Sequence, residues 1–205
     1  YNTGEVKIYD SNYRWVKTFS EYGSGPGENI KSEFTDIYKG YYYMPEAGNH
    51  RVSVWDLNAK FIYSFGSKGA GKGQLNNPEA AKFNSRGELV VSDLKNGRLI
   101  VYDVNPKQKK ASIIRVIASQ GSGKGQLKAN AGIGIDKEDN IYVGEIGNNR
   151  IQVFSRTGKF ITMWGKKGSG TGEFGNIHGV FVDKSTGWVY VADTANNRVQ
   201  VFAPK

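Results

Sequence analysis

The chain has 205 residues, no cysteine, 27 glycines and a net charge of +9. Its length allows one domain with a sizeable core. The lack of cysteine excludes a disulfide framework and thiolate chemistry, and no apolar stretch is long enough to span a membrane. The positive charge favours anionic partners in general.

The first predicted element is an alternating strand in "EVKIYD", residues 5–10, and a glycine-rich loop follows it. The copy of this loop at residues 66–75, "GSKGAGKGQL", looks like a phosphate-binding loop, but Gly73 stands where Ser or Thr would hold Mg²⁺. No helical periodicity follows it, so we interpret it as a repeated turn and not as a nucleotide site. The loop occurs four times, at intervals of 46, 52 and 47 residues, and its copies begin at Gly23, Gly69, Gly121 and Gly168.

A second signature follows each loop: an acidic residue, two spacers, Asn, any residue and Arg. Asn suits the turn, and the acidic residue can bridge to the Arg across a hairpin. Because the arrangement is repeated four times, while a catalytic site is normally asymmetric, we expect a structural role. The pairs are Glu46 and Arg51, Asp93 and Arg98, Glu145 and Arg150, and Asp193 and Arg198.

Each repeat resolves into four short strands, shown most clearly by "HGVFVDK", "WVYVADT" and "RVQVF" in the last copy and by "FITMWG" before it. Four-stranded units at this period indicate an all-β fold, a β-propeller of four-stranded antiparallel blades. A single four-stranded sheet cannot bury both of its faces, so the blades must stack around an axis. We therefore expect residues 1–205 to form a single propeller domain.

The strand "NNRVQVF", the loop pattern GxGxGxF and the strand "VYVAD" resemble NHL repeats over nearly the whole chain. The N-terminal unit departs most from the family, with "YYYMPEAGN" where "VYVADTANN" is typical. The resemblance implies a binding module, which in some animal members recognises single-stranded RNA. Related propellers include lyases that use a metal at the central channel.

The strand count is smaller than a six-bladed NHL ring requires. With strands named a to d from the axis outward, the chain reads c-d, then three full a-b-c-d sets, then a-b-c, which is four to five blades' worth. A four-bladed ring would close if residues 1–22 supplied strands c and d to the C-terminal a-b pair. The alternatives are an open part of a longer propeller and a ring completed by strands shared with another chain, for example in a homo-oligomer.

Two places are candidates for ligand contact. One is the face that carries the glycine loops, where Lys72, Lys124, Lys166 and Lys167 form either a solvated surface or an anionic-ligand surface. The other is the channel mouth, where Glu79, Lys82 and His178 stand near the entry to the innermost strands and serve either in packing or as ligands.

One unit also departs from the others in length. From the end of strand c to the next glycine loop is 13 residues in three units but 18 from Asp103 to Gly121, because of the segment "VNPKQKKAS" (104–112). A loop lengthened once in a repeat array often contacts a partner, and a tolerated surface insertion is the alternative.

The sequence favours a non-enzymatic binding or interaction propeller that recognises a protein or an anionic polymer, either polysaccharide or RNA. Only two histidines are present, and His50 falls in a turn, so we expect no metal, no cofactor and no catalytic residue. The alternatives are a single-stranded RNA-binding NHL propeller and a metal-dependent lyase or hydrolase with an incomplete channel site. The composition is compatible with an extracellular protein.

Overall fold

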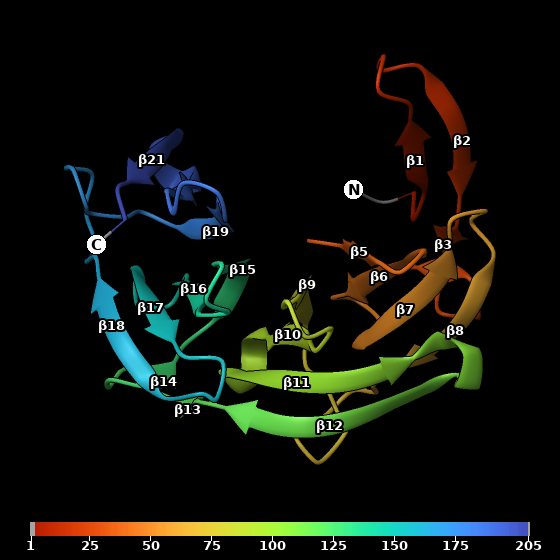
Figure 1. Ribbon diagram of the computed structural model, residues 1–205, viewed down its shortest axis with the longest axis horizontal. Coiled ribbons are helices and arrows are strands. Elements are labelled where there is room, and N and C mark those ends of the chain that lie inside the picture. Colours follow the sequence, from red (N-terminus) through yellow and green to blue (C-terminus); the bar gives the residue numbers. More distant parts are fainter. Residues whose placement is uncertain (1–2, 205) are drawn as a thin grey trace.

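The computed structural model describes residues 3–204 and confirms the predicted fold class, because antiparallel sheets follow one another as the blades of a propeller (Figure 1). Blade 1 has two strands, blades 2 to 4 have four each, and blade 5 has three, as the strand count predicts. No helix among the described residues is long and apolar enough to cross a membrane.

The two terminal blades, blade 1 and blade 5, have fewer than four strands. Blade 1 consists of β1 (Val6–Tyr9) and β2 (Trp15–Phe19). Blade 5 consists of β19 (Ile177–Val182), β20 (Val189–Asp193) and β21 (Arg198–Phe202), with the 3₁₀ turn η3 (Thr194–Asn196) between the last two.

The three complete blades each run outward from the axis. Blade 2 holds β5 (Asp36–Tyr38), β6 (Tyr41–Glu46), β7 (Arg51–Asp56) and β8 (Phe61–Phe65). Blade 3 holds β9 (Pro78–Phe83), β10 (Leu89–Asp93), the 3₁₀ turn η1 (Leu94–Asn96), β11 (Arg98–Asn105), the 3₁₀ turn η2 (Pro106–Gln108) and β12 (Lys110–Ile117). Blade 4 holds β15 (Asn130–Ile135), β16 (Ile141–Glu145), β17 (Arg150–Phe154) and β18 (Phe160–Trp164).

Each glycine loop connects two blades and closes on itself by a short parallel pairing. Two of these pairings are strands, β3 (Glu21–Tyr22) with β4 (Glu28–Asn29) and β13 (Ser119–Gln120) with β14 (Gln126–Leu127). The third glycine of the motif adopts a left-handed backbone in every copy, for example with φ of 75° at Gly125. This conformation is costly for any residue with a Cβ, which explains the glycine.

The core lies between the blades, because interior blades bury both of their faces. In β10, Val90 packs in the cluster between blades 3 and 4, whereas its neighbour Val91 packs in the cluster between blades 2 and 3. Both side chains are fully buried. Alternating side chains of a strand point to opposite faces, so a strand that is apolar at every position indicates a sheet covered on both sides.

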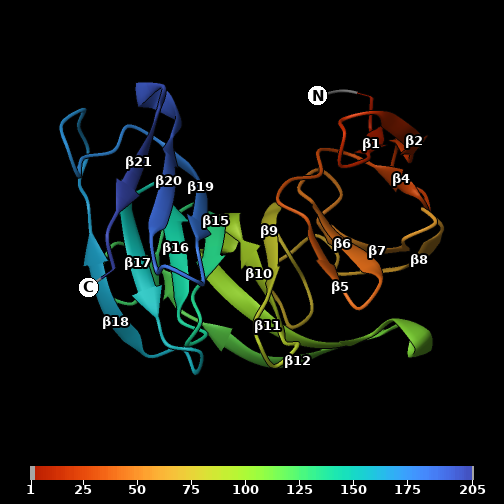
Figure 2. The same cartoon turned by 45° about the horizontal axis from the view of Figure 1, so that its top comes forward.

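The blades lie along an open arc, and the four-bladed closure considered from the sequence is wrong (Figures 1 and 2). Within residues 3–204, β1 pairs only with β2, and β21 pairs only with β20. The free face of blade 5 stays apolar: Val199 is 62% exposed, whereas Leu99 at the same repeat position of blade 3 is fully buried. Val201 and its counterpart Val101 show the same contrast.

The lengthened segment 104–112 is a hairpin extension, not a loop. β11 and β12 each have 8 residues and remain paired out to Asn105 and Lys110, with η2 forming the turn. The Tyr63 hydroxyl of blade 2 donates to the backbone carbonyl of Lys110 (3.1 Å), which ties the hairpin to the neighbouring blade. Figure 1 shows β11 and β12 reaching beneath blade 2.

Candidate functional site

The arginine of each second signature joins a hairpin to a glycine loop. In blade 4, the Arg150 Nε donates to the fully buried Glu145 (2.6 Å), and its terminal nitrogens donate to the backbone carbonyls of Ser122, Gly123 and Gln126. The Nε-to-carboxylate distances in the other copies are 3.0 Å (Glu46–Arg51), 2.7 Å (Asp93–Arg98) and 2.9 Å (Asp193–Arg198). In every copy the arginine also donates to carbonyls of the neighbouring glycine loop.

The asparagine of the signature adds a second tie. Asn148 Nδ2 donates both to Glu145 and to the carbonyl of Gly121, and Asn49, Asn96 and Asn196 make the equivalent bonds. The asparagine therefore does more than shape the turn, because it also satisfies one carbonyl of the glycine loop.

The four lysines predicted on the glycine-loop face are all exposed and lie on three separate loops. Lys72 lies between blades 2 and 3, Lys124 between blades 3 and 4, and Lys166 and Lys167 between blades 4 and 5. Lys166 forms an ion pair with Glu173 (3.2 Å). The four lysines are therefore distributed over three connections between blades.

Of the three residues predicted at the channel mouth, two lie together. His178 Nε2 is 3.5 Å from the Oε2 of Glu79, which is buried. Lys82 lies further along β9, where its Nζ is 3.7 Å from Asp36 of blade 2. Lys82 therefore joins two blades.

Two charged residues missed in the sequence complete the channel cluster. Glu33 and Lys31 precede blade 2, and the Lys31 Nζ is 3.4 Å from Glu33 and 3.5 Å from Glu79. Ser32 bridges to Glu46 as Pro78 pairs with Asp93, so Glu33 occupies the repeat position of Glu79 and His178. Aligning the repeats on the acidic residue of the second signature places Glu33 close to this position. That alignment is the sequence signal that could have found Glu33.

An aromatic residue holds this cluster together across the axis. The Phe34 backbone bonds with Glu79 and Ala81 of β9, and its ring lies 5.5 Å from that of His178 in β19. The segment before β5 thus contacts both blade 3 and blade 5. Residues far apart in the chain converge at this end of the axis.

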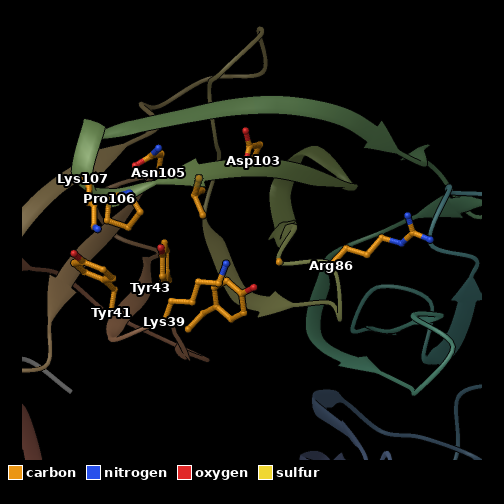
Figure 3. Close-up of a pocket in the computed structure, with 11 residues that line it drawn as sticks. Lys39, Tyr41, Tyr43, Arg86, Asp103, Asn105, Pro106 and Lys107 are labelled. Atoms are coloured by element: carbon orange, nitrogen blue, oxygen red, sulfur yellow. The ribbon is translucent and has the colours of Figure 1, made fainter.

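A second site lies between blade 2 and the extended hairpin (Figure 3). It is a cleft of about 450 Å³, and we call it the hairpin cleft. Figure 3 shows Tyr41, Tyr43 and Lys39 on one side of the cleft and Pro106 and Lys107 of the hairpin on the other, while the Asp103 and Asn105 side chains lie at its edge and point away from the tyrosines. The Arg86 side chain extends away from them.

The aromatic wall of the hairpin cleft is made of closely packed rings. Tyr38 stacks on Phe83 with ring centroids 4.3 Å apart, Tyr43 packs edge-on against the same ring, and the Lys39 Nζ lies 5.1 Å from the Tyr38 centroid. Burial raises the pKa of Tyr43 well above its ordinary value. The Tyr43 hydroxyl is therefore a neutral hydrogen-bonding group at physiological pH.

Comparison with known proteins supports the fold. A family model described as a 6-bladed beta-propeller matches residues 135–203. Peptidylglycine alpha-amidating monooxygenase of Rattus norvegicus is 25% identical over 182 residues, which is 86% of this chain and 18% of that protein. The Mus musculus enzyme is 26% identical over 235 residues, covering 90% of this chain and 24% of its own length. The chain thus spans at most about a quarter of these relatives.

Solved structures give the same result. Virginiamycin B lyase from Staphylococcus aureus has a TM-score of 0.66 at 11% identity, covering 98% of this chain and 63% of its own. An auxiliary nutrient binding protein from Bacteroides thetaiotaomicron has a TM-score of 0.63 at 16% identity, covering 85% of this chain and 48% of its own. At these identities the likeness concerns the fold alone, and the chain shares the β-propeller fold with these proteins.

Proposed function

We propose that the protein is a non-enzymatic recognition propeller that binds an acidic polysaccharide in the hairpin cleft. One observation carries the proposal: the single unit that departs from the repeat in length builds a cleft in which Lys39 and Lys107 stand beside tyrosines. In a repeat protein the common positions maintain the fold, so a feature made once is where recognition is expected.

The charges of the hairpin cleft suit an anionic ligand. Neither Lys39 nor Lys107 forms an ion pair with any of residues 3–204, and both are exposed. Lys109 and Lys110 lie at the same hairpin turn and are exposed as well. Carboxylate or sulfate groups of a polymer would gain charge-assisted hydrogen bonds from these ammonium groups.

The acidic and neutral groups of the cleft favour a saccharide over a nucleic acid. Asp103 is an acceptor that would repel a continuous run of phosphates, but it can accept hydrogen bonds from sugar hydroxyls. Asn105 and the tyrosine hydroxyls add neutral donors and acceptors. A polymer that carries more than one hydroxyl for each acidic group therefore matches this set better than RNA, which has one 2′-hydroxyl per phosphate.

We also propose that residues 1–205 form one domain that is an arc of an NHL-type six-bladed ring. The NHL-like motifs, the six-bladed family model over residues 135–203 and the uncovered apolar face of blade 5 support this. Tyr1, Asn2 and Lys205 lie outside the described residues. A further blade, in the same polypeptide or a second copy, would cover Val199 and Val201 as blade 4 covers Leu99 and Val101.

The binding proposal is tested by titrating the protein with polygalacturonate, with dextran as an uncharged polysaccharide and poly(U) as a phosphate polymer. We expect polygalacturonate to bind, dextran not to bind, and affinity to fall as salt rises. Replacing Lys39 and Lys107 by Ala together should weaken binding about tenfold, which is about 1.4 kcal/mol.

The matched control replaces Lys72 and Lys124 by Ala, which removes the same charge from the glycine-loop face. This control should retain the wild-type affinity apart from the small effect of net charge. Equal binding of polygalacturonate and dextran would contradict the proposal. Binding of poly(U) that is lost only in the control variant would instead favour RNA recognition on the glycine-loop face.

A further inference from the structure

The axial cluster of Glu33, Glu79 and His178 contains a buried carboxylate oxygen without a hydrogen bond. Glu79 is 3% exposed, and its Oε1 accepts from Asn77 Nδ2 (2.8 Å). Its Oε2 is fully buried and has no hydrogen-bond partner in the described residues. An unsatisfied buried carboxylate oxygen is costly, so it calls for a cation or donor that completes it.

The groups around that oxygen form a ligand set for a metal. One ligand atom from each of Glu33, Glu79 and His178 lies within 4.8 Å of the other two. Glu79 Oε2 and His178 Nε2 face each other at 3.5 Å. We propose that this cluster binds a divalent transition-metal ion, with Zn²⁺ as the matching case, at the axial end of the inner strands.

The chemistry and size of the cluster fit such an ion. Two carboxylates and one imidazole are a zinc donor set, whereas Ca²⁺ and Mg²⁺ prefer oxygen ligands alone. Tetrahedral zinc with bonds of about 2.1 Å holds its ligands about 3.4 Å apart. The Glu33 and His178 side chains are only partly buried and can rotate by the small amount required, while Glu79 stays fixed by Asn77.

Lys31 is the competitor for this site. Its ammonium lies between the two carboxylates, and its side chain is 46% exposed, so it can swing out to solvent. With Lys31 bound, the two carboxylates face one positive charge, whereas a divalent ion would balance both.

A substitution of Lys31 distinguishes a metal site from an ion-pair network. Replacing Lys31 by Gln removes the competing cation without touching a ligand. If the cluster is only an ion-pair network, this change should weaken the fold and leave metal affinity unchanged. If the cluster is a metal site, the same change should tighten zinc binding.

The experiment is calorimetric titration of the chelator-treated chain with ZnCl₂, repeated with CaCl₂. We expect one Zn²⁺ per chain, weak or no Ca²⁺ binding, and at least tenfold weaker zinc binding in Glu79→Gln and in His178→Ala. Glu138→Gln, an exposed carboxylate paired with Lys137, is the matched control and should bind as the wild type does. Lys31→Gln should bind about tenfold more tightly.

The outcomes separate cleanly. Zinc binding that Glu79→Gln and His178→Ala leave unchanged would overturn the proposal, because the ion would then lie elsewhere. If those two variants fail to fold by circular dichroism, Lys31→Gln decides: tighter binding supports the site, and unchanged or absent binding overturns it. The titration is independent of the hairpin cleft, so polysaccharide binding can fail while this site stands.

Discussion

Replacing Arg150 by Ala should destabilise the propeller more than the same change at the other three signature arginines, because Arg150 is the least exposed of the four. The Arg150 side chain is 11% exposed and Glu145 is fully buried. The substitution removes the 2.6 Å ion pair and leaves three carbonyls of the preceding glycine loop without this donor. Glu145 keeps Lys128 N, Asn148 and Gln152 as donors but loses its only cation within 4 Å among residues 3–204.

The magnitude follows from burial. Breaking a buried ion pair by removing one partner typically costs about 3–5 kcal/mol, against a total stability of about 5–15 kcal/mol for a typical protein. Arg198 is the internal control, because its side chain is 31% exposed and blade 5 is covered on one face only. Asp193 is fully buried but Arg198 is partly hydrated, so Arg198→Ala should cost more than the about 0–1 kcal/mol of a surface pair and less than Arg150→Ala.

The assay is urea unfolding followed by fluorescence of the four tryptophans. Arg150→Ala should lower the unfolding midpoint at an unchanged m-value, because the native structure still exposes the same surface on unfolding. A loss below about 1 kcal/mol, or equal losses for Arg150→Ala and Arg198→Ala, would refute the view that burial makes this signature a scaffold.

The left-handed glycine, the Arg115–Glu88 pair and the uncovered face of blade 5 can each be tested by substitution. Gly125→Ala should cost about 1–2 kcal/mol by thermal unfolding from backbone strain alone, because φ is 75° and the added Cβ would meet only the Phe160 Cβ at 3.8 Å; an unchanged melting temperature would contradict this. Hydrogen bonding by Arg115 holds the pKa of Glu88 below its ordinary 4.5. Arg115→Leu should therefore destabilise the fold at neutral pH, and the loss should shrink as pH falls through that lowered value. A difference in stability from wild type that stays constant between pH 7 and pH 2 would argue against the pair. Val199→Asp should change stability by less than about 1 kcal/mol, whereas Leu99→Asp should unfold the chain, because only Leu99 is covered by a neighbouring blade; similar losses would mean that the face of blade 5 is covered in solution.

Local repetition made most of the fold predictable from the sequence. The glycine loops, the alternating strands and the acid-to-arginine spacing recur with the same period, and each is a local feature. The strand count was correct for the same reason. Ring closure was not predictable, because it depends on which faces meet, and β1 does not pair with β21.

The candidate sites were less accessible to sequence reasoning because they are made by distant residues. Glu79 and His178 are about a hundred positions apart and meet only through the stacking of blades 3 to 5. Glu33 was missed because the first unit diverges around "YYYMPEAGN", which obscures its repeat register. The insertion at 104–112 was noticed, but its pairing with tyrosines of the preceding blade has no signal in the segment itself.

Hydrogen–deuterium exchange of the protein with and without polygalacturonate tests the proposed function most directly. The structure predicts slower exchange in residues 38–43, which include Lys39 and Tyr41, and in the turn between β11 and β12, which includes Lys107. The four glycine loops should exchange as in the free protein. Protection confined to those loops, with the hairpin unchanged, would contradict recognition in the hairpin cleft.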